Sequence, residues 1–392
     1  MLVLASCLLL ALLAAVRRSE LGFITLVALE WAAIMGIYLL MREHFVDISL
    51  ATQVLVVLLL SAMFVGLAAG AVVDLRARWR WPVTVSPTSY YLLASLAAAT
   101  TIVMVIRFDW LEVATASAFR ALLSDEGEMS VPTFGVGVSF PLTMGALFLA
   151  RARGERWKAV SFGVAGGLLA LLTTSKIFIL LYVLFLLPVN LDWRAMRFRP
   201  LLRYAVIAVA LVAALHLALG KVVGLGETSI VEALAITLAS YVGSGLAGLE
   251  LYVDDVANFP ANALWQQIGG LLPGVISVPE SPILPWVQVG GWDTNTYTAF
   301  SYWIDGLGLP GAVGFAVLVG WLGGRMLRLQ GLGARFITRF YVFGVFFLFH
   351  QDFFLSALVM WFAYGATAAL LSMVDATRVE SADTVRAGQL AG

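Results

Sequence analysis

Residues 49–73 read SLATQVLVVLLLSAMFVGLAAGAVV, a stretch without one charged side chain. A helix rises 1.5 Å per residue, so a stretch of this length can cross the roughly 30 Å of hydrocarbon in a bilayer. Lipid offers no partner for backbone N–H and C=O groups, and a single apolar segment satisfies them internally only as a helix. The stretch therefore predicts a transmembrane helix.

The rest of the chain repeats this pattern. Of its 392 residues, 61% are hydrophobic and 12% are charged, whereas about a quarter of a soluble domain is charged. The ten-residue alternation of a transmembrane β-barrel is absent from the sequence. We predict an all-α polytopic membrane protein, one integral domain over 1–392, with about eleven spans at residues 2–16, 21–41, 49–73, 88–106, 138–150, 158–173, 176–190, 204–222, 306–324, 340–350 and 354–374.

The basic residues orient these spans. Placing the N-terminus outside puts nineteen of the 24 Lys and Arg residues in cytoplasmic loops, as the positive-inside rule requires. One long helix over 158–190 would separate two basic clusters, so we expect two short spans there. The pattern predicts a multi-pass inner-membrane protein, with its N-terminus outside and a cytoplasmic tail at 375–392.

Two long outward segments concentrate the polar residues, at 107–137 and at 223–305. Long loops of this kind are often functional. The larger begins with 230–253, which we interpret as one or two amphipathic surface helices broken at Gly243-Ser244-Gly245. Its Trp and Tyr residues, Trp292 among them, indicate either an aromatic belt at the interface or a platform on which sugar rings pack.

Several classes of site have no signature in the sequence. One Cys and three scattered His give neither a disulfide framework nor a zinc spacing. A Walker A loop and a dinucleotide fingerprint are both absent from the sequence. We therefore expect no metal, no other cofactor and no nucleic-acid partner.

Five basic residues face outward against the positive-inside rule. Arg42 and Lys221 lie at span ends, where long side chains can reach the interface. The other three fit a lipid-linked phosphate or pyrophosphate, because Arg binds phosphate oxygens in pairs and Lys acts as a point charge. They are Arg107, for which an ion pair with a neighbouring carboxylate is the alternative, Arg120 and Lys176.

Candidates for proton transfer lie on the same side. His350 is placed at a hairpin tip and can titrate near neutral pH, although pairing with Asp352 to cap helix ends is an equally simple role. Glu30 lies within a span, where a carboxylate is a functional hypothesis by default. The remaining candidates are acidic residues of the outward segments: Asp254, Asp255, Asp305, Asp293 and Glu250.

Three stretches resemble the Wzy-type oligosaccharide repeat unit polymerases, the O-antigen polymerase family. Leu171-Leu172-Thr173-Thr174-Ser175-Lys176 is similar to the family's outward turn that ends in Ser and then Arg or Lys. Residues 240–246 resemble its Tyr-containing amphipathic segment, and 296–311 resemble its closing segment with an Asp-x-x-Gly pattern. Lys176 stands where many relatives have Arg.

The resemblance implies a glycosyltransferase with a glycosyltransferase-C-like helical fold. It would join oligosaccharide repeat units carried on undecaprenyl pyrophosphate into O-antigen or another polysaccharide. Arg107, Arg120 and Lys176 would stabilise the departing pyrophosphate, and Tyr241 and Trp292 would contact the glycan. His350, Asp305, Asp254 or Asp255 would take the acceptor proton.

Three alternatives stay open. An O-antigen ligase, which moves the finished glycan onto lipid A core, shares the plan and the donor. A transporter or flippase for lipid-linked sugars would be expected to show two related halves, which the sequence does not. The third alternative is an inactive partner of a polysaccharide chain-length regulator, and such a regulator is also a possible partner of the polymerase.

Overall fold

The computed structural model describes residues 1–8, 22–42, 45–72, 84–105, 130–172, 176–191, 193, 206–207, 209–214, 217, 229–254, 287–289, 292–294, 298–355 and 357–390. The predicted spans at 2–16 and 204–222 therefore lie only partly within the described residues. Predicted loop residues 107–129 and most of 255–297 lie outside them, and with them Arg107, Arg120 and Asp255.

The described chain is helical apart from one small hairpin. The helices are α2 (Gly22–Leu40), α3 (Leu50–Val72), α4 (Pro87–Val105), α6 (Ser130–Arg153), α7 (Arg156–Leu172), α8 (Lys176–Leu186), α10 (Ile230–Asp254), α12 (Ala299–Met326), α13 (Leu332–Phe346) and α14 (Leu358–Leu390). Strands β1 (Val287–Val289) and β2 (Trp292–Thr294) pair antiparallel, with Val289 opposite Trp292.

Apolar length supports a polytopic membrane protein. Within the described residues, five helices are long and apolar enough to cross a bilayer: Gly22–Leu40, Leu50–Val72, Gly135–Arg153, Ile230–Asp254 and Ala299–Met326. Residues 158–190 form two helices, α7 and α8, as predicted.

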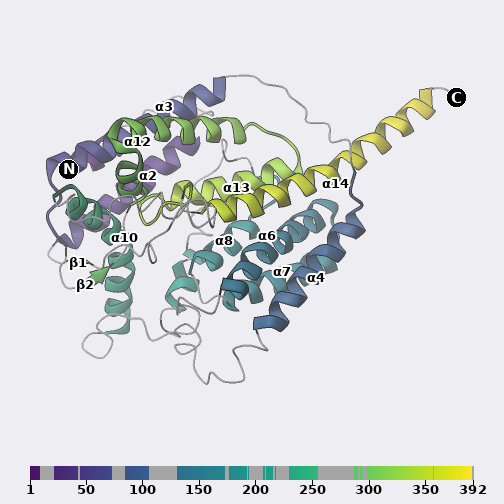
Figure 1. The fold of residues 1–392 in the computed structure, drawn as a ribbon, viewed down its shortest axis with the longest axis horizontal. Helices are drawn as coiled ribbons and strands as arrows, with labels where there is room; N and C mark the ends of the chain where they lie inside the picture. Colours follow the sequence, from purple (N-terminus) through teal and green to yellow (C-terminus); the bar gives the residue numbers. More distant parts are fainter. Residues whose placement is uncertain are drawn as a thin grey trace, which may run out of the picture.

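Two apolar cores share one helix (Figure 1). Helices α2, α3, α10 and α12 enclose the first core, and α4, α6, α7, α8 and α14 enclose the second. Helix α13 lies between them. It buries Tyr341 and Val345 in the first core and Phe336 and Phe340 in the second, where the Phe340 and Tyr364 rings stack 4.0 Å apart.

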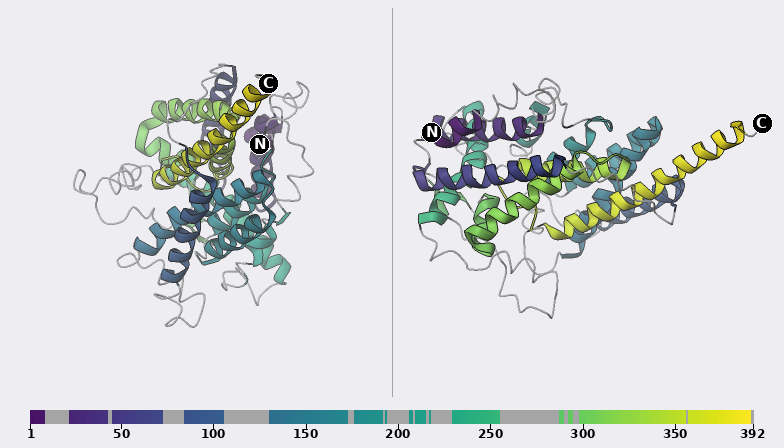
Figure 2. Two further views of the ribbon diagram at one scale, coloured as in Figure 1. Left: turned by 90° about the vertical axis from the view of Figure 1, so that its right-hand side faces the viewer. Right: turned by 90° about the horizontal axis from the view of Figure 1, so that it is seen from above.

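The contact between α3 and α12 depends on facing glycines. A Cβ on Gly66 would lie 2.0 Å from the Val317 carbonyl oxygen, and one on Gly320 would lie 1.9 Å from that of Met63. Gly66 and Gly70, like Gly320 and Gly324, form a GxxxG pair, the pattern that lets two membrane helices touch backbone to backbone. Val317 meets Gly66 and Trp321 meets Gly70, so the helices run parallel; Figure 2 shows them side by side.

Two arginines, Arg339 buried and Arg151 partly buried, close the end of α8. The Arg339 side chain is 1% exposed, and its Nη1 donates to the carbonyl oxygens of Leu184 and Leu187 at 2.9 and 3.0 Å. Arg151 Nη1 donates to those of Leu186 and Leu187 at 2.8 and 3.1 Å. The last carbonyls of a helix have no partner within it and carry partial negative charge, so two guanidinium groups stabilise this end.

Other basic residues gather at the same end of the fold. Arg335 donates to the Asn190 side chain just beyond α8. In the turn between α6 and α7, hydrogen bonds from Lys158 and Arg153 lower the pKa of the Glu155 carboxyl to about 2. We call this the basic end. Phe178 packs on Phe140 while Arg151 reaches Leu186, so α6 and α8 run parallel and begin at the opposite end.

Several predicted boundaries differ from the structure. Helix α10 continues through Gly243-Ser244-Gly245, so the predicted break there is wrong, because intrahelical hydrogen bonding tolerates glycine when neighbouring elements pack against it. Helix α6 begins at Ser130 and α14 continues to Leu390, beyond the body of the fold in Figure 1. Helix α12 begins at Ala299 and bends at Gly308, whose φ of 66° suits glycine.

The glycine contact between α3 and α12 gives a stability prediction. Gly320→Ala places a methyl group on the α3 backbone, so the helices must separate and the thermal unfolding midpoint of the purified protein should fall. Gly314→Ala is the matched control on α12, because nothing lies within 4 Å of its Cβ position. Removing an exposed helical glycine is neutral or stabilises by up to about 1 kcal/mol. Equal midpoints for the two variants would contradict the assigned contact.

Candidate functional site

Helix α10 lies across the ends of other helices, at the end of the fold opposite the basic end. Figure 1 shows it running across α3 and α12, not along them. Its contacts agree. Gly243 meets Phe45, which precedes α3, and Gly245 meets Phe349, which follows α13. Glu250 bonds to Ser49, the residue before α3 begins. One helix thus touches the ends of elements that are far apart in the sequence.

Glu250 fixes α10 to the beginning of α3. Its carboxylate is 3% exposed, and Oε2 accepts from the Ser49 backbone N–H at 2.9 Å and from the Ser49 hydroxyl at 3.1 Å. The Ser49 oxygen also accepts from the Thr52 amide at 3.2 Å, which makes Ser49 the N-cap of α3. A carboxylate at a helix N-terminus is favoured by the helix dipole as well.

Two glycines set the distance between α10 and its neighbours. A Cβ on Gly245 would lie 1.8 Å from the Phe349 carbonyl oxygen, and one on Gly243 would lie 2.4 Å from the Phe45 ring. Any larger residue would push α10 away from these groups. The two glycines at which the sequence predicts a helix break therefore serve as contact points.

His350 packs against α10. Its side chain is 8% exposed, in the turn that follows α13. The Tyr241 ring of α10 is 5.9 Å from the imidazole ring, and those of Phe347 and Phe349 are each 6.0 Å away. The structure thus brings together two predicted site residues, His350 and Tyr241, from segments about a hundred residues apart.

Asp352 has a structural role in the same turn. Its carboxylate is fully buried and accepts from the Trp303 indole N–H at 3.1 Å and from the Phe354 and Leu355 amides at 2.8 and 3.0 Å. The Ala299 amide donates to the Leu348 carbonyl at 2.8 Å. These bonds attach the beginning of α12 to the end of α13.

Asp305 lies on the first segment of α12, before the bend at Gly308, and is half-buried. It is close enough to Tyr252 of α10 to act on that phenol electrostatically. Asp254 is exposed as the last residue of α10. We call Tyr241, Glu250, Tyr252, Asp305 and His350 the end cluster.

The other predicted site residues are only partly placed. Lys176 begins α8, at the end of that helix away from the basic end, and its side chain lies outside the described residues. Trp292 is in β2, where its backbone pairs with Val289. Arg42, expected to reach the interface from a span end, donates to Asp47 at 2.6 Å, and this bond lowers the pKa of the Asp47 carboxyl.

Sequence reasoning missed Ser49 and gave Glu250 no special place among the acidic residues. The signal available was a Ser directly before an apolar helix, an N-cap pattern. No group of three or more metal-binding side chains occurs in the part of the chain that the structure describes.

Comparison with known proteins identifies a relative. No protein-family model and no solved structure matches the chain. An O-antigen polymerase of Shigella dysenteriae is 35% identical over 252 residues. The match covers 64% of this chain and 66% of the relative's length. This similarity confirms the resemblance that the sequence motifs predict, and the chain is a homologue of an O-antigen polymerase.

Proposed function

We propose that the chain joins oligosaccharide repeat units, carried on undecaprenyl pyrophosphate, into a polysaccharide on the outer side of the bacterial inner membrane. The observation that carries this proposal is the 35% identity to an O-antigen polymerase. The polymer is O-antigen or an exopolysaccharide. A polysaccharide chain-length regulator is a possible partner, and the reaction needs no cofactor of its own.

We propose about eleven spans in a glycosyltransferase-C-like arrangement, with the N-terminus outside and the C-terminus cytoplasmic. Outward segments 107–137 and 223–305 are then periplasmic, 375–392 is the cytoplasmic tail, and the end cluster faces the periplasm. The clustering of Arg151, Arg335 and Arg339 at the basic end supports this orientation. The crossing of α10 over helix ends supports a surface helix at the outer face.

In the proposed reaction, a hydroxyl oxygen of the new repeat unit bonds to the anomeric carbon of the growing chain. The bond from that carbon to the phosphate oxygen breaks, and the pyrophosphate leaves on its lipid carrier. A base takes the hydroxyl proton. We assign this role to His350, with Asp305, Asp254 and Asp255 as the other candidates. His350 is favoured because it lies under Tyr241, a predicted glycan contact.

Leaving-group charge needs cations close to it. We assign this role to Arg107, Arg120 and Lys176, and we assign glycan stacking to Tyr241 and Trp292. Lys176 begins α8 at the same end of the fold as the end cluster, which supports its assignment.

Reconstitution tests the proposal. The purified protein is mixed with lipid-pyrophosphate-linked repeat units, and products are separated by size on a gel. We expect a ladder of regularly spaced products. Folded protein that gives no ladder, but transfers glycan when lipid A core is added, would indicate a ligase. Movement of labelled lipid across sealed vesicles without sugar joining would indicate a transporter.

Removing the outward cations should abolish long polymer. Lys176→Ala and Arg107→Ala each remove a charge that stabilises the pyrophosphate, so we expect the rate to fall by about a hundredfold or more. Arg107→Lys should be almost as damaging if both phosphate oxygens are bound by the guanidinium fork. The readout is chain length on the gel at equal membrane protein levels. Normal chain length in both alanine variants would exclude the pyrophosphate assignment.

Substitutions at Glu250 separate positioning from proton transfer. Glu250→Gln keeps an oxygen that can accept from Ser49, so activity should be largely retained; Glu250→Ala loses the bond and should raise KM more than it lowers kcat. Glu232→Ala is the matched control, an exposed Glu in the first turn of the same helix. An inactive Glu250→Gln protein with normal stability would show instead that the carboxylate itself takes part in the reaction.

A further inference from the structure

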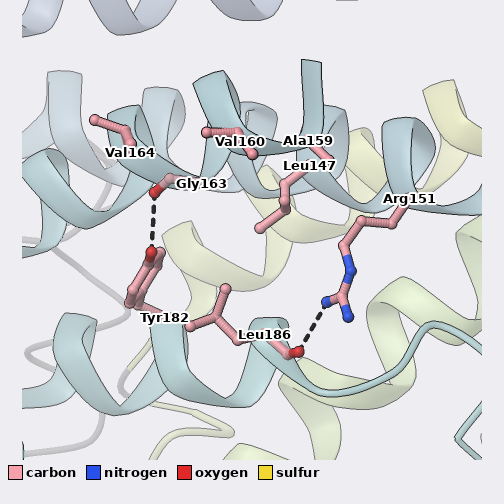
Figure 3. Close-up of a pocket in the computed structure, with 8 residues that line it drawn as sticks. All are labelled: Leu147, Arg151, Ala159, Val160, Gly163, Val164, Tyr182 and Leu186. Atoms are coloured by element: carbon pink, nitrogen blue, oxygen red, sulfur yellow. Dashed lines mark hydrogen bonds between the residues drawn. The ribbon is translucent and has the colours of Figure 1, made fainter. Parts of the chain in front are cut away.

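At the basic end, a groove lies between α6, α7 and α8, far along these helices from the end cluster (Figure 3). Its volume is about 370 Å³. Apolar side chains line most of it, among them Leu147, Val160 and Val164. The Tyr182 side chain extends across it from α8 to α7, where its hydroxyl donates to the Gly163 carbonyl oxygen at 3.0 Å.

The groove opens toward the exposed apolar surface of α7. Val160 and Val164 are 58% and 59% exposed, and Leu168 and Leu171 continue the same apolar face. At the first turn of α7, Trp157 is 85% exposed beside Arg156 and Lys158. Trp and basic residues mark the depth of the lipid headgroups. The groove thus runs from headgroup depth into the hydrocarbon, the shape that an acyl chain needs.

Uncompensated positive charge lies at the headgroup end of the groove. Glu155 is the one carboxylate of the segment 151–158, and it pairs with Arg153 and Lys158. In the part of the chain that the structure describes, no carboxylate pairs with Arg151 or Arg156. Arg151 Nη1 donates to the α8 carbonyl oxygens, and no described residue accepts a hydrogen bond from its Nε or Nη2. Figure 3 shows its guanidinium beside Leu186, at the edge of the groove.

We propose that this groove binds one anionic phospholipid. An acyl chain lies along Val160 and Val164, and the phosphate accepts hydrogen bonds from Arg151 and Arg156. Basic pockets between membrane helices on the cytoplasmic side are a known way to hold anionic headgroups. The lipid would also bridge α7 and α8, two short helices joined by few other polar contacts in the described part of the chain.

Native mass spectrometry of the purified full-length protein tests the proposal, with phosphatidylglycerol and phosphatidylcholine of identical chains as probes. We expect phosphatidylglycerol to stay bound and to raise the thermal unfolding midpoint more than phosphatidylcholine does. Arg156→Gln removes an exposed charge, and Gly163→Leu fills the groove, since only Leu147 lies within 4 Å of the Gly163 Cβ position. Each should weaken phosphatidylglycerol binding about tenfold.

Two matched control variants leave the groove lining, Arg151 and Arg156 unchanged. Gly365→Leu adds the same side chain to α14 in open space, and Arg328→Gln removes a cation that follows α12 and does not line the groove; both should bind phosphatidylglycerol normally. Equal binding of the two lipids, or unchanged binding in Arg156→Gln and Gly163→Leu, would overturn the proposal. So would an equal shift from inorganic phosphate alone, or displacement of the phospholipid by undecaprenyl phosphate.

Discussion

The backbone contact between α3 and α12 is the constraint on which the rest of the fold depends. Hydrocarbon does not drive helices together, so membrane helices associate through close packing and polar contacts. Gly66 and Gly320 bring the two backbones within reach of each other. Because the two helices run parallel, Ser49 at the beginning of α3 and the α12 segment before the bend at Gly308 lie toward the same end of the fold. Those beginnings form the surface on which α10 rests.

This arrangement explains how a site can form from distant segments. Ser49 at the beginning of α3 holds Glu250, and the α12 segment before the bend carries Asp305 toward α10. The turn after α13 is fixed to α12 through Asp352, and it presents His350 to Tyr241. Glu250, Asp352 and His350 are therefore positioned by contacts that join the ends of different helices.

Much of this could be predicted from the sequence, because the membrane allows few structures. Apolar length predicts most described helices, and basic residues predict which helix ends lie together. The role of α10 was harder to predict. Gly243 and Gly245 suggested a break, and only the neighbouring chain shows that they are contact points. The pairing of Glu250 with Ser49 joins residues 201 positions apart, which no local pattern encodes. The GxxxG pairs of α3 and α12 are visible in the sequence, but the motif does not identify which helix each of them contacts.

The central claim is that α10 lies across the outer helix ends, although its apolar length would let it cross the bilayer. Cysteine labelling tests this directly. In a Cys7→Ser background, Glu232→Cys and Asp254→Cys place single thiols near the two ends of α10. A membrane-impermeant thiol reagent is then added to intact spheroplasts. The account predicts that both positions are labelled from outside. Labelling of one end from outside, and of the other only after the membrane is opened, would show that α10 spans the bilayer and would contradict the account.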